Sequence, residues 1–147
     1  MYKRILVATD GSELSAKAVS SALDFAQLAN AELVALNVIA PTAVSYWEGT
    51  SRTEIHDSTV ADDAHTKAGH AIVHAVKEAA EQKGINTQAI TIKSDLVAES
   101  IIAAAQEYQC ELIVMASHGR RGINRMLMGN ETLNVLTHSK IPVLVLR

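Results

Sequence analysis

Short apolar runs alternate with helix-like segments along the whole chain, and this alternation restricts the fold more than any other feature. The runs cover residues 4–9, 31–40, 87–93, 112–116 and 141–146, with the length and composition of β-strands. Apolar residues at helical spacing fill the segments 12–29, 57–82 and 130–139, and a further segment that opens at Asp95. A βαβαβαβαβ order calls for a parallel sheet with right-handed crossovers. We therefore predict an α/β fold with an open five-stranded parallel sheet, order 3-2-1-4-5, and helices on both faces.

Local signals predict how the helices begin, end and face the core. We expect Ser12 to lie in the first N-cap region and Gly84 to stop the second helix. The residues predicted to face inward are Leu14, Ala18, Ala22, Phe25 and Ala29 in the first helix, Ala68, Ile72, Ala75 and Ala79 in the second, and Ala98, Ile101, Ile102 and Ala105 in the third.

Composition limits the function classes. At 147 residues with 48% hydrophobic and 20% charged residues, the chain has the balance of one globular domain, residues 1–147. A net charge of -3 lacks the basic footprint of a nucleic-acid-binding domain. The single cysteine, Cys110, suits a reducing cytosol. The apolar run before Asp10 is too short for a signal or membrane segment, so we expect a cytoplasmic protein with no membrane partner.

The end of the chain has the pattern of a phosphate-binding unit. The strand at 112–116 leads into a loop with Gly119, Gly122 and Gly129, which a short helix and the last strand follow. Such glycines let backbone amides approach a phosphate, and the next helix N-terminus offers unpaired N–H groups. In the predicted strand order, Asp10 meets residues 117–119 at the switch point between strands one and four, where ligands of these sheets bind.

Two stretches carry motifs that can be compared with a known family. The first is 5–12, Ile-Leu-Val-Ala-Thr-Asp-Gly-Ser, and the second joins 113–122, 128–129 and 141–145. By these motifs the chain resembles the universal stress protein family over its whole length. The resemblance implies a Rossmann-like, adenine nucleotide alpha hydrolase-like fold in a small cytosolic homodimer made under stress. One branch of the family binds ATP through a Gly-x-x-Gly-x9-Gly-Ser/Thr motif, and another branch lacks the motif and does not bind ATP.

This chain keeps the motif in part. Gly119 and Gly129 stand at the second and third glycine positions, but Ala116 replaces the first and Asn130 replaces the final Ser/Thr. The methyl group that Ala116 adds at this position is tolerable where no phosphate or ribose needs the same volume. Asparagine is a good N-cap, and its amide can donate to a phosphate.

Glu131 stands where the ATP-binding members usually carry a small apolar residue. A carboxylate about 6 Å from a phosphate costs on the order of 1–3 kcal/mol at an effective dielectric near 20. Arg120, Arg121 and Arg125 in the same loop could offset that repulsion. The alternative is that Glu131 is a first-turn acid that stabilises its own helix.

The resemblance implies a role for each site residue. Gly119 and Gly129, with the N–H groups around Asn130, would take the phosphates, Asp10 the ribose or a magnesium ion, and the Val38 backbone the adenine. The implied nucleotide-binding residues are Ala8, Thr9, Asp10, Val38, Met115, Ala116, Ser117, Gly119, Gly129, Asn130, Glu131 and Thr132. The expected cofactor is ATP or another adenine nucleotide, with Mg²⁺ through Asp10.

Three functions stay open on the sequence. The leading one is a stress-response homodimer that binds an adenine nucleotide between strands one and four. The alternative is a nucleotide-independent member that acts through dimerisation and protein partners. Slow ATP hydrolysis is a third, but no residue has the features of a general base, so we assign no catalytic residue and expect no enzyme.

The strand at 141–146 is wholly apolar and lies at a sheet edge in the predicted order, where Pro142 is tolerated. Because an open apolar edge favours aggregation, we predict that it pairs with its counterpart in a second subunit.

Two other segments have competing interpretations. Residues 41–57, which include Tyr46 and Trp47, form a long irregular segment typical of a lid, a binding loop or a packing contact. Histidines gather at 56, 65, 70 and 74, and His70 with His74 has the spacing of helical metal ligands. No cysteine or nearby glutamate completes a set, so solvated helix histidines are favoured over a zinc site.

Overall fold

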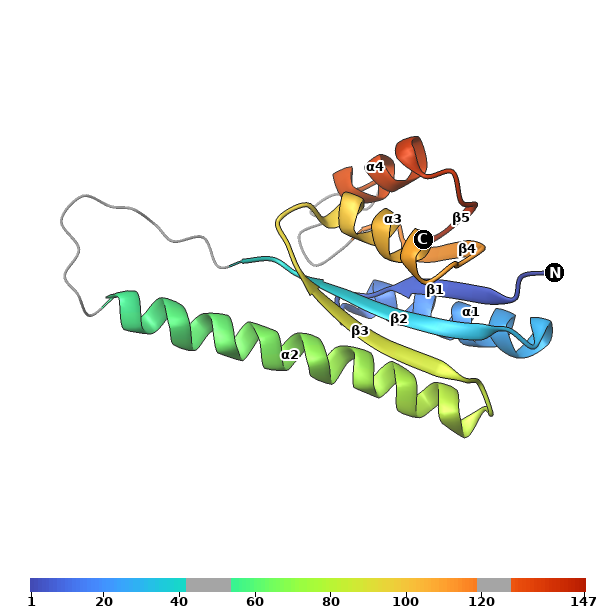
Figure 1. Ribbon diagram of the computed structural model, residues 1–147, viewed down its shortest axis with the longest axis horizontal. Coiled ribbons are helices and arrows are strands. Elements are labelled where there is room, and N and C mark those ends of the chain that lie inside the picture. Colours follow the sequence, from blue (N-terminus) through green and yellow to red (C-terminus); the bar gives the residue numbers. More distant parts are fainter. Residues whose placement is uncertain (42–53, 119–127) are drawn as a thin grey trace.

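The computed structural model describes residues 1–41, 54–118 and 128–147, and of these the side chains of 54–62 are not described. The elements are β1 (Arg4–Ala8), α1 (Glu13–Ala29), β2 (Glu32–Ile39), α2 (Glu54–Gln82), β3 (Thr87–Lys93), α3 (Val97–Glu107), β4 (Leu112–Ala116), α4 (Asn130–His138) and β5 (Val143–Leu146). All strand pairs are parallel, in the order β3-β2-β1-β4-β5 (Figure 1). The predicted fold class and strand order are therefore confirmed.

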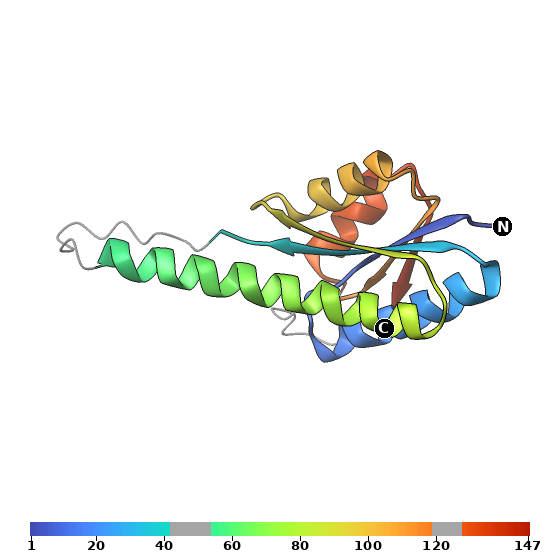
Figure 2. The ribbon, with the colours of Figure 1, turned by 60° about the horizontal axis from the view of Figure 1, so that its bottom comes forward.

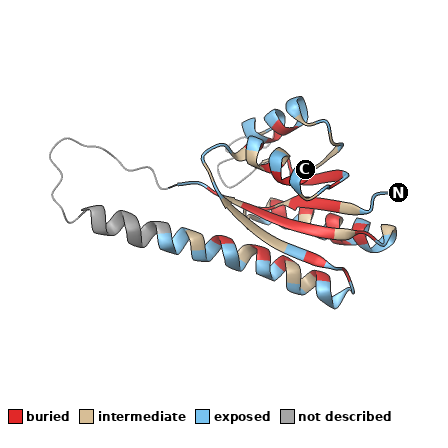
Figure 3. Cartoon of the chain, in the orientation of Figure 1, coloured by how far each residue is buried: buried red, intermediate tan, exposed pale blue. Residues whose placement is uncertain are grey.

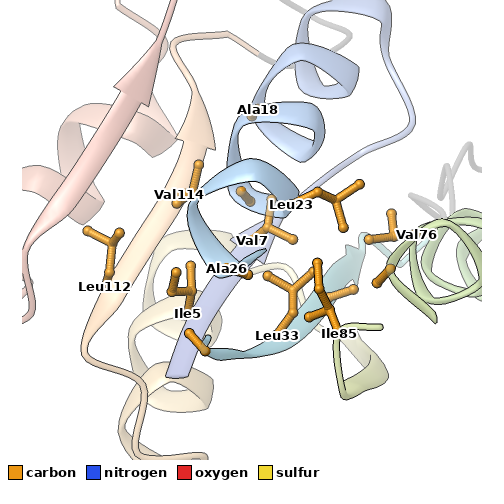
Figure 4. Close-up of a cluster of buried hydrophobic side chains, with 14 of the residues drawn as sticks. Ile5, Val7, Ala18, Leu23, Ala26, Leu33, Val76, Ile85, Leu112 and Val114 are labelled. Carbon is orange, nitrogen blue, oxygen red and sulfur yellow. The ribbon is translucent and has the colours of Figure 1, made fainter. Parts of the chain in front are cut away.

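The sheet separates two apolar cores, because α1 and α2 cover one face and α3 and α4 the other (Figure 2). Alternate residues of each central strand point into opposite cores. In β1, for example, Ile5 and Val7 pack against α1 and α2 (Figure 4), whereas Leu6 packs against α3 and α4. This burial on both faces explains why the central strands are continuous apolar runs.

The inward face predicted for α1 is correct except at Phe25, since Ala18 and Ala22 are buried, whereas the face predicted for α2 is displaced by one residue. Phe25 is 45% exposed, and the buried residues of α1 are Ser15, Ala18, Ala22, Leu23 and Ala26. In the part of α2 whose burial is described, residues 63–82, the buried positions are Gly69, Val73, Val76 and Ala80, each one residue after the predicted set (Figure 3). Both helices are rich in alanine, so several stripes have similar apolar content and periodicity alone does not choose among them. The predicted face of α3 is largely correct, with Ala98, Ile101 and Ala105 buried.

The start of α3 and the N-cap of α4 also differ from the prediction, although α4 begins at Asn130 as predicted. Ser12 caps α1 as expected, by accepting the Ser15 N–H at 3.2 Å. However, α3 begins at Val97, with Leu96 rather than Asp95 at its start, and the N-cap of α4 is Gly129 rather than Asn130. Neither N-cap residue makes a side-chain capping bond.

A polar network joins the amino ends of β1 and β2 to the residues that precede β3 and β4. Arg4 donates from Nε to Glu32 Oε2 at 2.8 Å and from Nη1 to the Tyr108 carbonyl at 2.8 Å. Asn86 donates to the other carboxylate oxygen of Glu32 at 2.9 Å. The hydrogen bonds from Arg4, and then from Asn86, hold the pKa of Glu32 below its usual value. Among the helices in the described ranges, none is both long and apolar enough to cross a membrane.

Candidate functional site

A cavity of about 550 Å³ opens at the carboxyl ends of β1, β2 and β4, where the crossover direction of the sheet changes. The first turns of α1, α3 and α4 complete its wall. The residues that line it are Ala8, Thr9, Asp10, Ser15, Leu36, Asn37, Val38, Ala40, Val97, Ile101, Met115, Ala116, His118, Gly129, Asn130, Glu131 and Thr132. Its volume lies within the range typical of small-molecule sites.

One lip of the cavity is the turn between β1 and α1. The Ser12 N–H donates to Asp10 Oδ1 at 2.9 Å, which fixes the carboxylate at the strand end. The Thr9 and Ser15 hydroxyls lie 2.9 Å apart, and the Asn37 amide donates to the Thr9 carbonyl at 2.8 Å. These bonds hold a carboxylate at the mouth of the cavity, where it can accept hydrogen bonds from hydroxyl groups or contact a cation.

The opposite lip is the N-terminus of α4, which is attached to the end of β4. The Gly129 N–H donates to the Ser117 carbonyl at 2.8 Å, and the Thr132 hydroxyl donates to the Ala116 carbonyl at 3.0 Å. A Cβ on Gly129 would lie 3.2 Å from the Ser117 carbonyl oxygen, so glycine permits this close approach. Because Gly129 offers no side-chain acceptor, the first turn of α4 presents its N–H groups and positive dipole end to the cavity.

Glu131 lies in that first turn, but its carboxylate is bound to a different helix. Glu131 Oε2 accepts the backbone N–H of Ala98 at 3.0 Å, in the first turn of α3. The alternative in which this acid stabilises only its own helix is therefore incomplete. Glu131 remains exposed and also lines the cavity.

His118 lies at the end of β4 beside Gly129. Its Nδ1 is 2.8 Å from the Ser117 hydroxyl. Its Nε2 is buried, and no hydrogen-bond partner for it is found in the described part of the chain. The imidazole ring is thus anchored on one side and lines the cavity on the other.

The structure brings together most of the residues that the resemblance implied. Ala8, Thr9, Asp10, Val38, Met115, Ala116, Gly129, Asn130, Glu131 and Thr132 all line the cavity. Ser117 is buried at the strand end and is not among the lining residues. Gly119, together with Gly122, Arg120, Arg121 and Arg125, lies outside the described residues.

Several lining residues were not foreseen in the sequence. Leu36 shares a strand face with Val38, so period-two alternation could have indicated it. Val97 and Ile101 enter the wall because α3 packs over the ends of β2 and β4, which no local pattern shows.

Of the other candidate residues that the structure describes, His65, His70, His74 and Cys110 are not among those that line this cavity. His70 Nδ1 is 3.4 Å from the Thr91 hydroxyl on β3, and the side chain of His56 is not described. Within the described residues, no three or more His, Cys, Asp or Glu side chains are grouped to hold a metal. Cys110 is buried, and burial raises the pKa of its thiol to about 11, which makes the nucleophilic thiolate scarce. Tyr46 and Trp47 fall outside the described ranges.

Comparisons of family, sequence and structure all match this chain to universal stress proteins. The model of the universal stress protein family matches residues 1–147. Universal stress protein YxiE of Bacillus subtilis (strain 168) is 32% identical over 149 aligned residues that cover all of both chains. The solved structure of protein MJ0577, of Methanocaldococcus jannaschii, has a TM-score of 0.81 at 27% identity and covers 99% of this chain and 96% of that chain. A universal stress protein in complex with cAMP has a TM-score of 0.72 at 25% identity, with 99% and 97% of the two chains covered.

Proposed function

Because this chain belongs to the universal stress protein family, we propose that it binds ATP or another adenine nucleotide in the cavity between β1 and β4. The observation that carries the proposal is the convergence of Asp10, Gly129 and the first turn of α4 on one cavity of nucleotide size. A structural relative in complex with cAMP supports the same ligand class.

The two lips of the cavity bind different parts of the nucleotide. The uncapped first turn of α4 takes the phosphates, because its N–H groups and dipole favour an anion. Asp10 takes the ribose hydroxyls, or a Mg²⁺ ion that bridges to the phosphates. The apolar wall formed by Leu36, Val38 and Met115 suits the face of a purine base, and the Val38 backbone can address its edge.

The departures from the family motif fit this assignment. Ala116 is buried and packs into the core of α1 and α2, so its methyl is accommodated within the fold. Asn130 is the first helical residue, where its side-chain amide can donate to a phosphate. The carboxylate of Glu131 is engaged by Ala98, and its exposure lets solvent screen its charge.

The proposal is tested by isothermal titration with ATP, AMP and cyclic AMP, each with and without Mg²⁺. We expect one site per chain, with ATP tightened by Mg²⁺ if Asp10 holds the ion. Heat denaturation of the purified protein should also release any carried nucleotide, which absorbs as adenine. Absence of heat with all three ligands, together with a supernatant free of adenine absorbance, would reject nucleotide binding.

That negative result would favour the second candidate, a nucleotide-independent member that acts through dimerisation and protein partners. The observations behind this candidate are the half-buried edge strand β5 and two exposed apolar side chains of α4, Leu133 and Leu136, which are 52% and 38% exposed. In either case we propose a cytoplasmic, single-domain binding protein without a catalytic residue.

A further inference from the structure

Helix α3 lacks a cap of its own and takes one from α4. Its N-cap residue, Leu96, has an apolar side chain that cannot accept a first-turn N–H. The Ala98 N–H instead donates to Glu131 Oε2 at 3.0 Å, across 33 positions of the sequence. One carboxylate in the first turn of α4 thus serves the N-terminal ends of two helices.

This bond holds a wall of the cavity in place. Val97 and Ile101, which flank Ala98 in the first turns of α3, line the cavity, and Leu36, Val38 and Met115 line it from the sheet. All five belong to the core on the α3 and α4 side of the sheet. The position of α3 over the sheet sets the width of the apolar part of the cavity, and the bond from Ala98 to Glu131 is one contact that holds α3 there.

We propose that Glu131 is a positioning residue that fixes α3 against α4 and thereby sets the fit of the base and ribose, rather than a carboxylate that acts on the phosphates. The inference rests on the proposed adenine-nucleotide site and assigns Glu131 a role within it. Loss of the bond lets the α3 wall relax, and the affinity falls for every ligand that carries the base, whatever its charge.

Two substitutions at one position separate geometry from charge. Glu131→Gln keeps an oxygen that can accept the Ala98 N–H but removes the charge, whereas Glu131→Val removes both. Calorimetry is carried out with adenosine, which has no phosphate, and with ATP. We expect Glu131→Gln to bind both as the wild type does, and Glu131→Val to bind both about three- to tenfold more weakly, as the loss of a helix cap implies.

A third variant distinguishes positioning from simple stabilisation. Adding Leu96→Asp to Glu131→Val gives α3 a capping side chain of its own but does not restore its hydrogen bond to residue 131 of α4. We expect this double variant to recover thermal stability without recovering adenosine affinity. Hydrogen exchange at the Ala98 amide should be slow in the wild type and in Glu131→Gln, and faster in Glu131→Val.

The outcomes that overturn the proposal are distinct from those that overturn nucleotide binding. Tighter ATP with unchanged adenosine in both single variants would show that the charge acts on the phosphates. Two results would show that the bond between Ala98 and Glu131 does not position the α3 wall. One is wild-type affinity in Glu131→Val, and the other is recovery of adenosine affinity when Leu96→Asp is added. If the wild type binds neither adenosine nor ATP, the proposed function fails, and the role of Glu131 in the site fails with it.

Discussion

At the residue scale, Gly129 is the glycine of the cavity wall at which a larger side chain would meet the backbone. Its N–H is bonded to the Ser117 carbonyl, and a Cβ would meet the same oxygen at 3.2 Å. We expect Gly129→Ala to push the first turn of α4 from the end of β4 and misplace the N–H groups that we propose bind the phosphates. Overpacking costs about 1–3 kcal/mol, so ATP affinity should fall by roughly five- to a hundredfold, as measured by calorimetry.

Gly84 provides the matched control for that substitution. Its φ is +73°, and nothing lies within 4 Å of a Cβ built there, at the C-terminal end of α2. Gly84→Ala should therefore cost about 1–2 kcal/mol of stability through backbone strain and leave ATP affinity unchanged. Equal loss of affinity in both variants would mean that general destabilisation, not the Gly129 contact, lowers binding.

At the scale of elements, the network of Arg4, Glu32 and Asn86 joins β1 and β2 to the turn that precedes β3. Since the pKa of Glu32 is lower in the folded protein than its usual 4.5, the folded state favours the carboxylate. The stabilisation is present above the pKa of the unfolded state and is lost as the pH falls through the folded pKa. We expect the stability of Glu32→Gln to depend less on pH below about 4.5 than that of the wild type.

Urea unfolding at a series of pH values measures this difference. Glu78, an exposed glutamate of α2, gives the control variant Glu78→Gln, which should follow the wild-type pH profile. A Glu32→Gln profile that parallels the wild type throughout the acid range would contradict the role of the network.

The elements also show what the sequence could predict. The bounds of β3 and β4 agree with the prediction to the residue, since each is a strand-forming run with clear breaks at both ends. The prediction began α3 at Asp95, whereas the helix begins at Val97. The difference arises because the group that caps this helix comes from Glu131, which is distant in sequence. The same reason hid Val97 and Ile101 from the predicted site, whereas Asp10 and Gly129 followed from topology and motif. Sequence patterns report local conformational preference, whereas the start of α3 and the positions of Val97 and Ile101 depend on tertiary packing.

At the scale of the whole molecule, the edge of the sheet formed by β5 is the feature that favours association with a second subunit. Among the described strands, β5 pairs only with β4, and all four of its residues are half-buried. The Pro142 carbonyl accepts the N–H of Ile113 in β4, and the Leu146 carbonyl accepts the N–H of Ser117, which directly follows β4. Because a parallel strand directs alternate residues to opposite neighbours, Val143 and Val145 turn their N–H and C=O groups to the open edge.

We therefore expect a twofold dimer in which the β5 strands of two subunits pair along this edge. Val145→Pro removes an outward N–H while the hydrogen bonds to the Pro142 and Leu146 carbonyls remain, so it should convert the dimer to a monomer that is still folded. Val145→Thr keeps the N–H and a β-branched side chain, and it should remain dimeric. Sedimentation at micromolar concentration checks both against the 15.7 kDa chain mass. A wild type that sediments as a monomer, or a Val145→Pro variant that stays a dimer, would place the subunit interface elsewhere or remove it.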